Sequence, residues 1–140
     1  MNQKTITIAI DAMGGDNSPF KCLKGIEIFN NKKKNIKSII LGDKNIINET
    51  IQNKKIIINK YEIIDCTNNI QNDDTANTIL RNRKDSSINK GLAVIKNKSL
   101  SGFVSSGNTA AIMILSRLNL GMIEGIHRPA ICSLIPNKTN

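Results

Sequence analysis

The sequence predicts an α/β fold in which a doubly wound, mostly parallel sheet lies between layers of helices. Three observations support this expectation. Short apolar runs recur along the chain, and most of them end in a carboxylate, a glycine or a hydroxyl. Segments with apolar residues at helical spacing follow most of these runs. Because no linker rich in proline and glycine and no low-complexity stretch interrupts the alternation, we expect a single domain over residues 1–140.

The first strand and the first helix flank the turn around which the chain is organised. Isoleucines alternate through residues 6–10, and a carboxylate, two glycines and a second carboxylate follow them. Ser18 and Pro19 are typical of the N-cap and the first residue of a helix. This helix is expected to end near residues 30–31 and to bury one apolar face, formed by Phe20, Leu23, Ile26 and Phe29.

The next part of the chain repeats this pattern. Residues 38–43 and 61–65 are each expected to form a strand that ends in a carboxylate. Residues 45–53 carry isoleucines at helical spacing. Residues 56–58 are ambiguous, because they could finish that helix or form a strand of their own.

The second half of the chain contains three helical patterns and two strand patterns. After a polar loop at residues 67–74, a helix over residues 75–83 is expected to turn Ile79 and Leu80 inward. The patterns that follow are a helix capped by Ser86 and Ser87 with Ile88, Leu92 and Ile95 as its apolar stripe, a strand at residues 102–105, a helix at residues 110–120 and a strand at residues 130–135.

The last predicted strand would leave the sheet without its next crossover helix. Parallel edge strands are rarely left uncovered. We therefore expect a Rossmann-like three-layer sandwich with right-handed crossovers that is incomplete, as part of a larger protein.

The net charge of +9 raises the question of polyanionic partners. The lysines are scattered, the longest run covers only residues 32–34, and aromatic residues make up 3% of the chain, too few to stack on bases. We therefore expect a solvated basic surface and no nucleic-acid partner, and leave open partners that carry phosphate or lie at a membrane surface.

The cysteines and the start of the chain favour a cytoplasmic protein. Cys22, Cys66 and Cys132 are far apart and have neither disulfide-framework nor zinc-site spacing. The first strand follows Met1 too closely for a signal peptide, and no apolar run approaches the length of a membrane span. We expect no metal and no organic cofactor.

The first of three polar loops follows the first strand. It contains Asp11, Gly14, Gly15 and Asp16. The glycines would let backbone amides approach a ligand, while the carboxylates orient that ligand or hold basic groups. The alternative is a structural turn with helix-capping acids. The dinucleotide pattern GxGxxG is absent, so a nicotinamide site is poorly supported.

The second and third polar loops offer further donors. Arg81, Ser86 and Ser87 combine a guanidinium with two hydroxyls at a helix start, which suits a phosphate or an oxyanion. The third loop provides small residues and neutral donors that could stabilise an oxyanion, namely Ser105, Ser106, Gly107, Asn108 and Thr109. The alternative in both cases is an ordinary helix cap. A serine hydrolase has little support, because the GxSxG pattern is absent and His127 is remote from any serine.

Five motifs in the same order carry a resemblance to a known family. The sequence resembles the amino-terminal part of the PlsX-type phosphate acyltransferases of bacterial phospholipid synthesis, on the motifs IAIDAMGGDNSP (6–19, with the strand that leads into it), ILGD (40–43), RKDSSI (83–88), FVSSGNTAAIM (103–113) and GIHRPAICSLIP (125–136). Two positions depart from the family pattern, Ser106 where alanine is usual and Ala110 where glycine is usual.

The resemblance implies transfer of a fatty acyl group from acyl carrier protein to inorganic phosphate. It also implies a homodimer, peripheral association with the inner face of the membrane and a downstream glycerol-3-phosphate acyltransferase as partner. Asn108 and Ser86 become the candidate catalytic residues, and the other polar residues of the three loops become candidate phosphate or substrate contacts. Since phosphate is itself the nucleophile, the reaction needs positioning and oxyanion donors and no catalytic cysteine.

Two other classes of function stay open at this point. The family's chain is more than twice as long, so the protein could be a catalytically inactive remnant or a binding module that keeps the fold. Nucleic-acid binding through the charge of +9 is the third hypothesis, and it would show a steep salt dependence.

Overall fold

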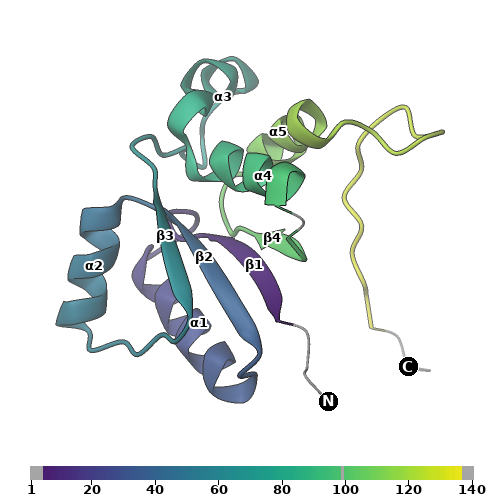
Figure 1. Ribbon diagram of the computed structural model, residues 1–140. Coiled ribbons are helices and arrows are strands. Elements are labelled where there is room, and N and C mark those ends of the chain that lie inside the picture. The colour runs from purple at the N-terminus through teal and green to yellow at the C-terminus, as the bar shows by residue number, and fades with distance from the viewer. Residues whose placement is uncertain (1–4, 99, 137–140) are drawn as a thin grey trace.

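The structure is a computed structural model that describes residues 5–98 and 100–136. Its core is a four-stranded, all-parallel sheet with helices on both faces (Figure 1). The strands are β1 (Ile6–Asp11), β2 (Ile36–Gly42), β3 (Tyr61–Asp65) and β4 (Gly102–Val104). The helices are α1 (Phe20–Lys32), α2 (Lys44–Asn53), α3 (Ala76–Asn82), α4 (Ser87–Lys98) and α5 (Thr109–Leu120), with a 3₁₀ turn at Arg83–Asp85.

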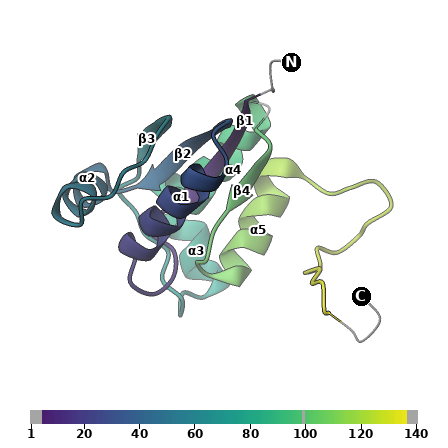
Figure 2. The ribbon, with the colours of Figure 1, turned by 90° about the horizontal axis from the view of Figure 1, so that it is seen from below.

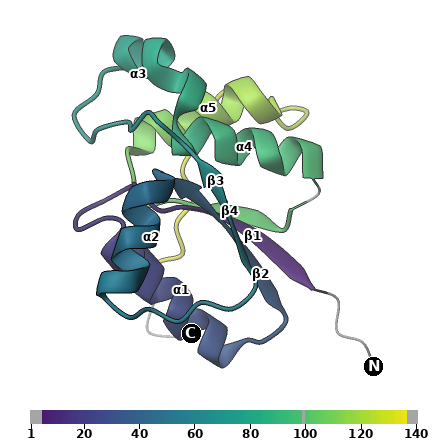
Figure 3. The same ribbon diagram turned by 60° about the vertical axis from the view of Figure 1, so that its left-hand side comes forward.

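The strand order β3-β2-β1-β4 makes the sheet doubly wound. The chain moves outward from β1 through β2 to β3, and then crosses to the other side of β1 to form β4. Helices α1 and α2 lie on one face, whereas α4 and α5 lie on the other (Figures 2 and 3). The predicted α/β fold class is confirmed, and the direction of winding reverses between β1 and β4.

Apolar side chains fill both faces of the sheet because successive residues of a strand point to opposite sides. On β2, Ile40 joins the cluster beneath α1 and α2, while Ile39 and Leu41 join the cluster on the opposite face. A third cluster holds α3, α4 and α5 together and consists of Ile70, Ile79, Ile88, Leu92, Ala111 and Leu115.

Most of the predicted elements are confirmed to within two residues at each end. This holds for the strands at residues 6–10, 38–43, 61–65 and 102–105 and for α1, α2, α3 and α5, while α4, for which only the start was predicted, begins at Ser87. Residues 56–58 form neither a helix nor a strand, since α2 ends at Asn53, and Ile56 is buried in the cluster beneath α1.

The predicted details of α1 were partly wrong. The residue before the helix is Pro19, and Ser18 instead donates its hydroxyl to the carbonyl oxygens of Gly14 and Gly15, at 2.5 and 2.9 Å. Phe20 and Phe29, expected on the buried face, are 39% and 43% exposed.

The buried positions of α1 include two polar residues in place of those rings. Glu27 is buried because its carboxylate accepts the N–H of Ile57 at 2.8 Å and pairs with Lys24. The hydrogen bond from Lys24, and then that from Ile57, hold the pKa of Glu27 below its usual value. Asn30 is the second buried polar residue of the helix. On α3, Leu80 is 39% exposed, contrary to the inward orientation predicted for it.

The strand predicted at residues 130–135 is not formed. Ile131, Leu134 and Ile135 are 65%, 99% and 85% exposed, and this segment runs without regular structure beyond α5 (Figure 1). A strand needs a neighbour for its backbone hydrogen bonds. Within the described residues the sheet ends at β4, and the segment does not pair with it. The prediction failed because a strand-like pattern does not supply that neighbour.

Candidate functional site

The carboxyl ends of β1 and β4 lie side by side where the winding reverses. Parallel pairing sets Ile10 opposite Val104, so the loops that follow these strands start next to each other. In open α/β sheets, ligands bind in the crevice at this switch point. The first and third predicted polar loops are those two loops, and the structure therefore brings them together.

Asp11 ties the two loops to each other. Its side chain is 2% exposed, and Oδ1 accepts the backbone N–H groups of Met13 and Gly14 at 3.0 and 3.2 Å. Its Oδ2 accepts the hydroxyl of Ser105 at 2.7 Å, and Ser105 Oγ in turn accepts the N–H of Gly107 at 3.0 Å. Asp11 therefore organises the site by fixing the backbone around it.

The glycines allow the two backbones to touch. A Cβ on Gly14 would lie 2.6 Å from the backbone nitrogen of Gly107, which no real side chain tolerates. Gly15 has a φ of +81°, in the left-handed region that favours glycine, and a Cβ there would lie 3.0 Å from the carbonyl oxygen of Ser106. In this structure the glycines allow one loop to approach the other closely, and their predicted role toward a ligand stays a prediction.

Asn108 links the third loop to the loop after β3. Its Oδ1 caps α5 by accepting the N–H of Ala111 at 2.9 Å. Its Nδ2 donates to the carbonyl oxygens of Gln71 and Asn72 at 3.0 and 3.1 Å. The side chain is 7% exposed, so its donors face carbonyls in this structure, and its role as an oxyanion donor stays a prediction.

Ser86 lies beside the same loop, and Ser87 follows it as the first residue of α4. Both are buried, at 0% and 2% exposure, at the start of α4. Ser86 forms an isolated parallel bridge with Asn68, and its Oγ accepts the N–H of Asn89 at 3.3 Å. The two predicted catalytic residues, Ser86 and Asn108, therefore hold the loop of residues 66–75 between them.

A polar cavity of about 330 Å³ opens beside these loops. Its lining combines the β1–α1 loop, the first turn of α1 and single residues of two other loops: Gly14, Gly15, Asp16, Ser18, Lys21, Cys22, Asn72 and Ser106. Four of these residues belong to the predicted site, whereas Lys21 and Asn72 do not. The sequence does contain a signal for Lys21, because a cation in the first turn of a helix interacts unfavourably with the helix dipole and is therefore unusual there.

The start of α1 differs from the other helix starts at this edge of the sheet. Asp43 caps α2, and Asn108 caps α5. Among the described residues, no side chain caps α1, whose first turn borders the polar cavity. The first amide groups of a helix carry partial positive charge, so an uncapped start with a lysine beside it favours an anion.

An apolar cavity of about 340 Å³ adjoins the polar one. It lies between α1 and the strands β1 and β4, and shares Lys21, Cys22 and Ser106 with the polar cavity. Burial, and then the nearby charge of Asp11, raise the pKa of the Cys22 thiol to about 11. Cys22 is thus a neutral thiol at the junction and a poor nucleophile at neutral pH.

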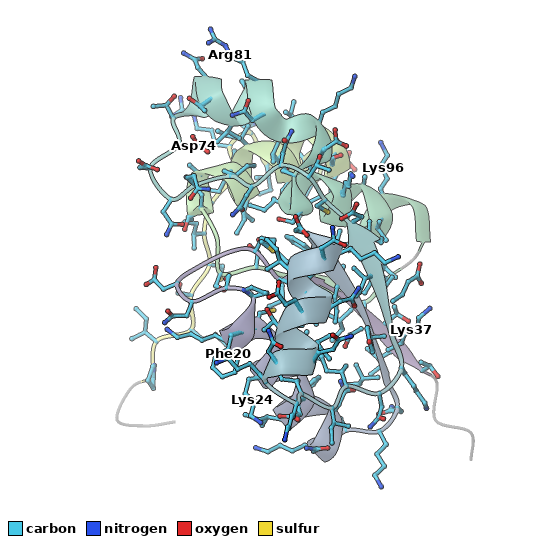
Figure 4. All side chains as sticks on the ribbon, turned by 90° about the vertical axis from the view of Figure 1, so that its left-hand side faces the viewer. Phe20, Lys24, Lys37, Asp74, Arg81 and Lys96 are labelled. Atoms are coloured by element: carbon cyan, nitrogen blue, oxygen red, sulfur yellow. The ribbon has the colours of Figure 1, made fainter. Side chains whose placement is uncertain are left out.

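Two predicted site residues lie elsewhere. Arg81 is exposed on α3, and its side chain points away from the rest of the molecule (Figure 4). Thr109 is exposed at the start of α5 and borders a different cavity, of about 400 Å³, beside residues 129–131. The structure therefore does not bring these two side chains into the polar cavity.

The residues that the structure describes contain neither a metal-binding cluster nor a membrane-spanning helix. No group of three or more histidine, cysteine or acidic side chains there could hold a metal ion. None of the helices in residues 5–98 and 100–136 has the length and hydrophobicity needed to cross a membrane.

Fold and site together define a doubly wound α/β protein with a polar cavity, lined by Lys21 and Asp16 among others, that adjoins an apolar one at the switch point. The chain belongs to the family described as fatty acid synthesis protein, whose model matches residues 6–140. This family membership confirms the resemblance found in the sequence.

Several relatives carry the name phosphate acyltransferase. The protein of Caldicellulosiruptor bescii is 41% identical over 131 residues, covering 94% of this chain and 39% of the relative. Those of Wolbachia sp. subsp. Drosophila simulans (40% identical, 96% and 40% covered) and Clostridium tetani (34% identical, 94% and 39% covered) are similar to the chain over the same part. The chain thus spans about 40% of the length of these relatives.

Proposed function

We propose that the chain is the amino-terminal part of a phosphate acyltransferase that forms acyl phosphate from fatty acyl carrier protein and inorganic phosphate. The observation that carries the proposal is the junction of the polar cavity with the apolar cavity at Lys21, Cys22 and Ser106. A substrate pair made of an anion and an acylated thioester needs such a junction. The names of the relatives support the same activity.

The proposed reaction needs no nucleophile from the protein. A phosphate oxygen attacks the thioester carbonyl carbon, the tetrahedral oxyanion collapses, and the C–S bond breaks. The carrier thiolate leaves and takes up a proton, and the acyl group stays on phosphate. The enzyme has to orient the phosphate and stabilise the oxyanion.

In our proposal, different residues bind the phosphate and stabilise the oxyanion. Lys21 and the uncapped start of α1 attract the phosphate into the polar cavity. Ser106, whose hydroxyl donates to Gly14 O at 3.3 Å, is near enough to exchange that bond for one to the substrate. Ser86 and Asn108 position the loop that carries Asn72 into the cavity. Asp16 lines the cavity as well and is suited to orient basic groups of the site or of a partner.

The proposal extends to the partners. Acyl carrier protein would deliver the substrate, a homodimer would form the complete enzyme, and peripheral attachment to the inner face of the membrane would pass the product to a glycerol-3-phosphate acyltransferase. The chain would be cytoplasmic, with no metal, organic cofactor or nucleic acid involved.

A binding module without activity is the second candidate, favoured by one observation. The chain spans about 40% of its relatives' length, so residues from the remainder could be required for catalysis. Such a module would bind phosphate in the polar cavity without cleaving the thioester.

A carrier-protein release assay separates the two candidates. The chain alone, and a chimera in which the unmatched remainder of one of these relatives follows the chain, are mixed with acyl carrier protein thioester at increasing phosphate concentration. The proposal expects free carrier thiol to appear in proportion to phosphate, together with acyl phosphate detected by mass spectrometry. Phosphate binding without release, in both proteins, would support the binding module and contradict the acyltransferase.

A further inference from the structure

We propose that the apolar cavity holds the acyl chain, and that Gly25 determines how long a chain it accepts. This inference rests on the proposed function. The residues that line the cavity come from α1, β1, β2 and β4, whose arrangement Figure 2 shows, and from the loop after β4. Its apolar lining comprises Ile8, Ile10, Ile26, Phe29, Ile36 and Val104. These side chains offer an alkyl chain apolar contacts.

The position of the cavity relative to the polar one indicates the occupant. Lys21, Cys22 and Ser106 border both cavities, so a single molecule can extend through the junction. Such a molecule has an anionic or carbonyl head and an alkyl tail. A methylene is about the size of a water molecule, whose share of liquid volume is about 30 Å³, so the apolar cavity has room for about ten carbons.

Gly25 borders this cavity at an exposed position of α1, and the packing of the helix does not require it. It lies inside the helix, where glycine is less favourable than alanine, and borders the cavity. A Cβ built on Gly25 would meet no atom within 4 Å, and its φ is not in the left-handed region. Neither packing nor backbone conformation therefore requires glycine at this position.

The other glycine inside a helix shows the contrast. On α4, a Cβ on Gly91 would collide with the ring of Phe103, so glycine there is required by packing. The missing side chain of Gly25 instead enlarges the space that an alkyl tail would occupy. Gly25 is thus placed to determine chain length.

Calorimetric titration with a series of n-alkyl phosphates, from butyl to dodecyl and below their micelle concentrations, tests the proposal on the 140-residue chain. Affinity should rise about fourfold for each added methylene, the equivalent of about 0.8 kcal/mol, and level off near ten carbons. Gly25→Leu should weaken decyl phosphate binding at least tenfold and leave butyl phosphate within twofold. For Gly25→Ala, the affinity for decyl phosphate should lie between that of the parent chain and that of Gly25→Leu.

Two controls keep loss of binding separate from loss of folding. Both Gly25 variants should melt at or above the temperature of the parent chain, because alanine and leucine favour helix. Ile28→Ala removes a 50% exposed side chain of α1 that does not border the cavity, and should leave the whole series unchanged.

The outcomes distinguish this inference from the function on which it rests. Affinity that is independent of chain length, or unchanged by Gly25→Leu, overturns the acyl cavity even if phosphate-dependent transfer is observed. Chain-length dependence that disappears in the chimera with the remainder of a relative also overturns it, since a following segment then fills the cavity. Length-dependent binding without any transfer supports the cavity and counts against the proposed function alone.

Discussion

The two loops that meet at the switch point use their polar groups in opposite ways. In the β4–α5 loop, Ser105 donates to Asp11, and Asn108 both caps α5 and donates to the carbonyls of the loop after β3. In the β1–α1 loop, the start of the helix has no side-chain cap among the described residues and borders the polar cavity. The side chains of Ser105 and Asn108 thus fix neighbouring loops, whereas the first turn of α1 borders the polar cavity without a side-chain cap.

This difference teaches that residue type alone does not assign a role. Serine and asparagine at a strand end suggest donors for a substrate, yet here their hydrogens already have acceptors within the protein. Among the described residues that line the polar cavity, Lys21 is the one cation, and it lies on α1, outside the three loops predicted to form the site.

Removing the Asp11 carboxylate should have the largest effect, because it would break the link between the loops. Asp11→Ala leaves the amides of Met13 and Gly14 and the hydroxyl of Ser105 without their acceptor, at a cost of about 3 kcal/mol in the free energy of unfolding. Asp11→Asn keeps one acceptor oxygen and should cost about 1 kcal/mol. Urea unfolding measures both, and equal stability of the two variants would contradict the linking role.

Forcing the loops apart should have the next largest effect. Gly14→Ala places a methyl group 2.6 Å from the nitrogen of Gly107 and should destabilise the protein by about 2 kcal/mol. Gly25→Ala, where the methyl group meets no neighbour within 4 Å, is the matched control and should stabilise by about 1 kcal/mol. Thermal unfolding of both variants checks the prediction, which fails if Gly14→Ala is as stable as the parent chain.

Replacing Lys21 tests whether the polar cavity beside the start of α1 binds an anion. Lys21→Ala should weaken phosphate binding about fivefold, or about 1 kcal/mol, because it removes the cation at the polar cavity. Lys32→Ala, at the other end of α1, should leave phosphate affinity unchanged. Titration calorimetry at low salt measures both, and similar losses in the two variants would indicate a general effect of charge instead.

The smallest effect concerns the thiol at the junction. Since the pKa of Cys22 is raised to about 11, its thiolate fraction and its alkylation rate should rise about tenfold per pH unit between pH 8 and 10. Asp11→Asn removes the nearby negative charge and should shift this profile toward lower pH. Peptide mapping after brief iodoacetamide treatment follows Cys22 separately, and a profile identical in both proteins would contradict the influence of Asp11.

Local pattern predicted the sheet, the helices and the strand ends where the site lies. These features depend on apolar spacing and on turn residues, which neighbouring positions determine. The misassigned Ser18 shows the limit of that information. Its hydroxyl could cap the helix or return to the loop, and only the folded path of residues 14–18 decides in favour of the loop.

Long-range partners account for the other differences. Glu27 is buried because Ile57, thirty residues away, donates its N–H to the carboxylate. Residues 130–135 have a strand-like pattern but pair with no strand among the described residues. Ser86 and Asn108 lie next to the same loop because α4 crosses over the sheet between them in the chain. This proximity could not be predicted from the number of residues that separates them.

The bonds of Ser18 have a consequence for how tightly an anion is held. Ser18 and Ser106 both donate to the carbonyl oxygen of Gly14, and Ser18 also donates to that of Gly15. These hydroxyls cover the negative ends of two peptide groups that would otherwise repel phosphate. A hydroxyl that donates to the ligand must first break such a bond, so its net contribution to the binding free energy is only the difference between two hydrogen bonds. Ground-state affinity for phosphate should therefore be modest, which leaves interaction energy for the transition state.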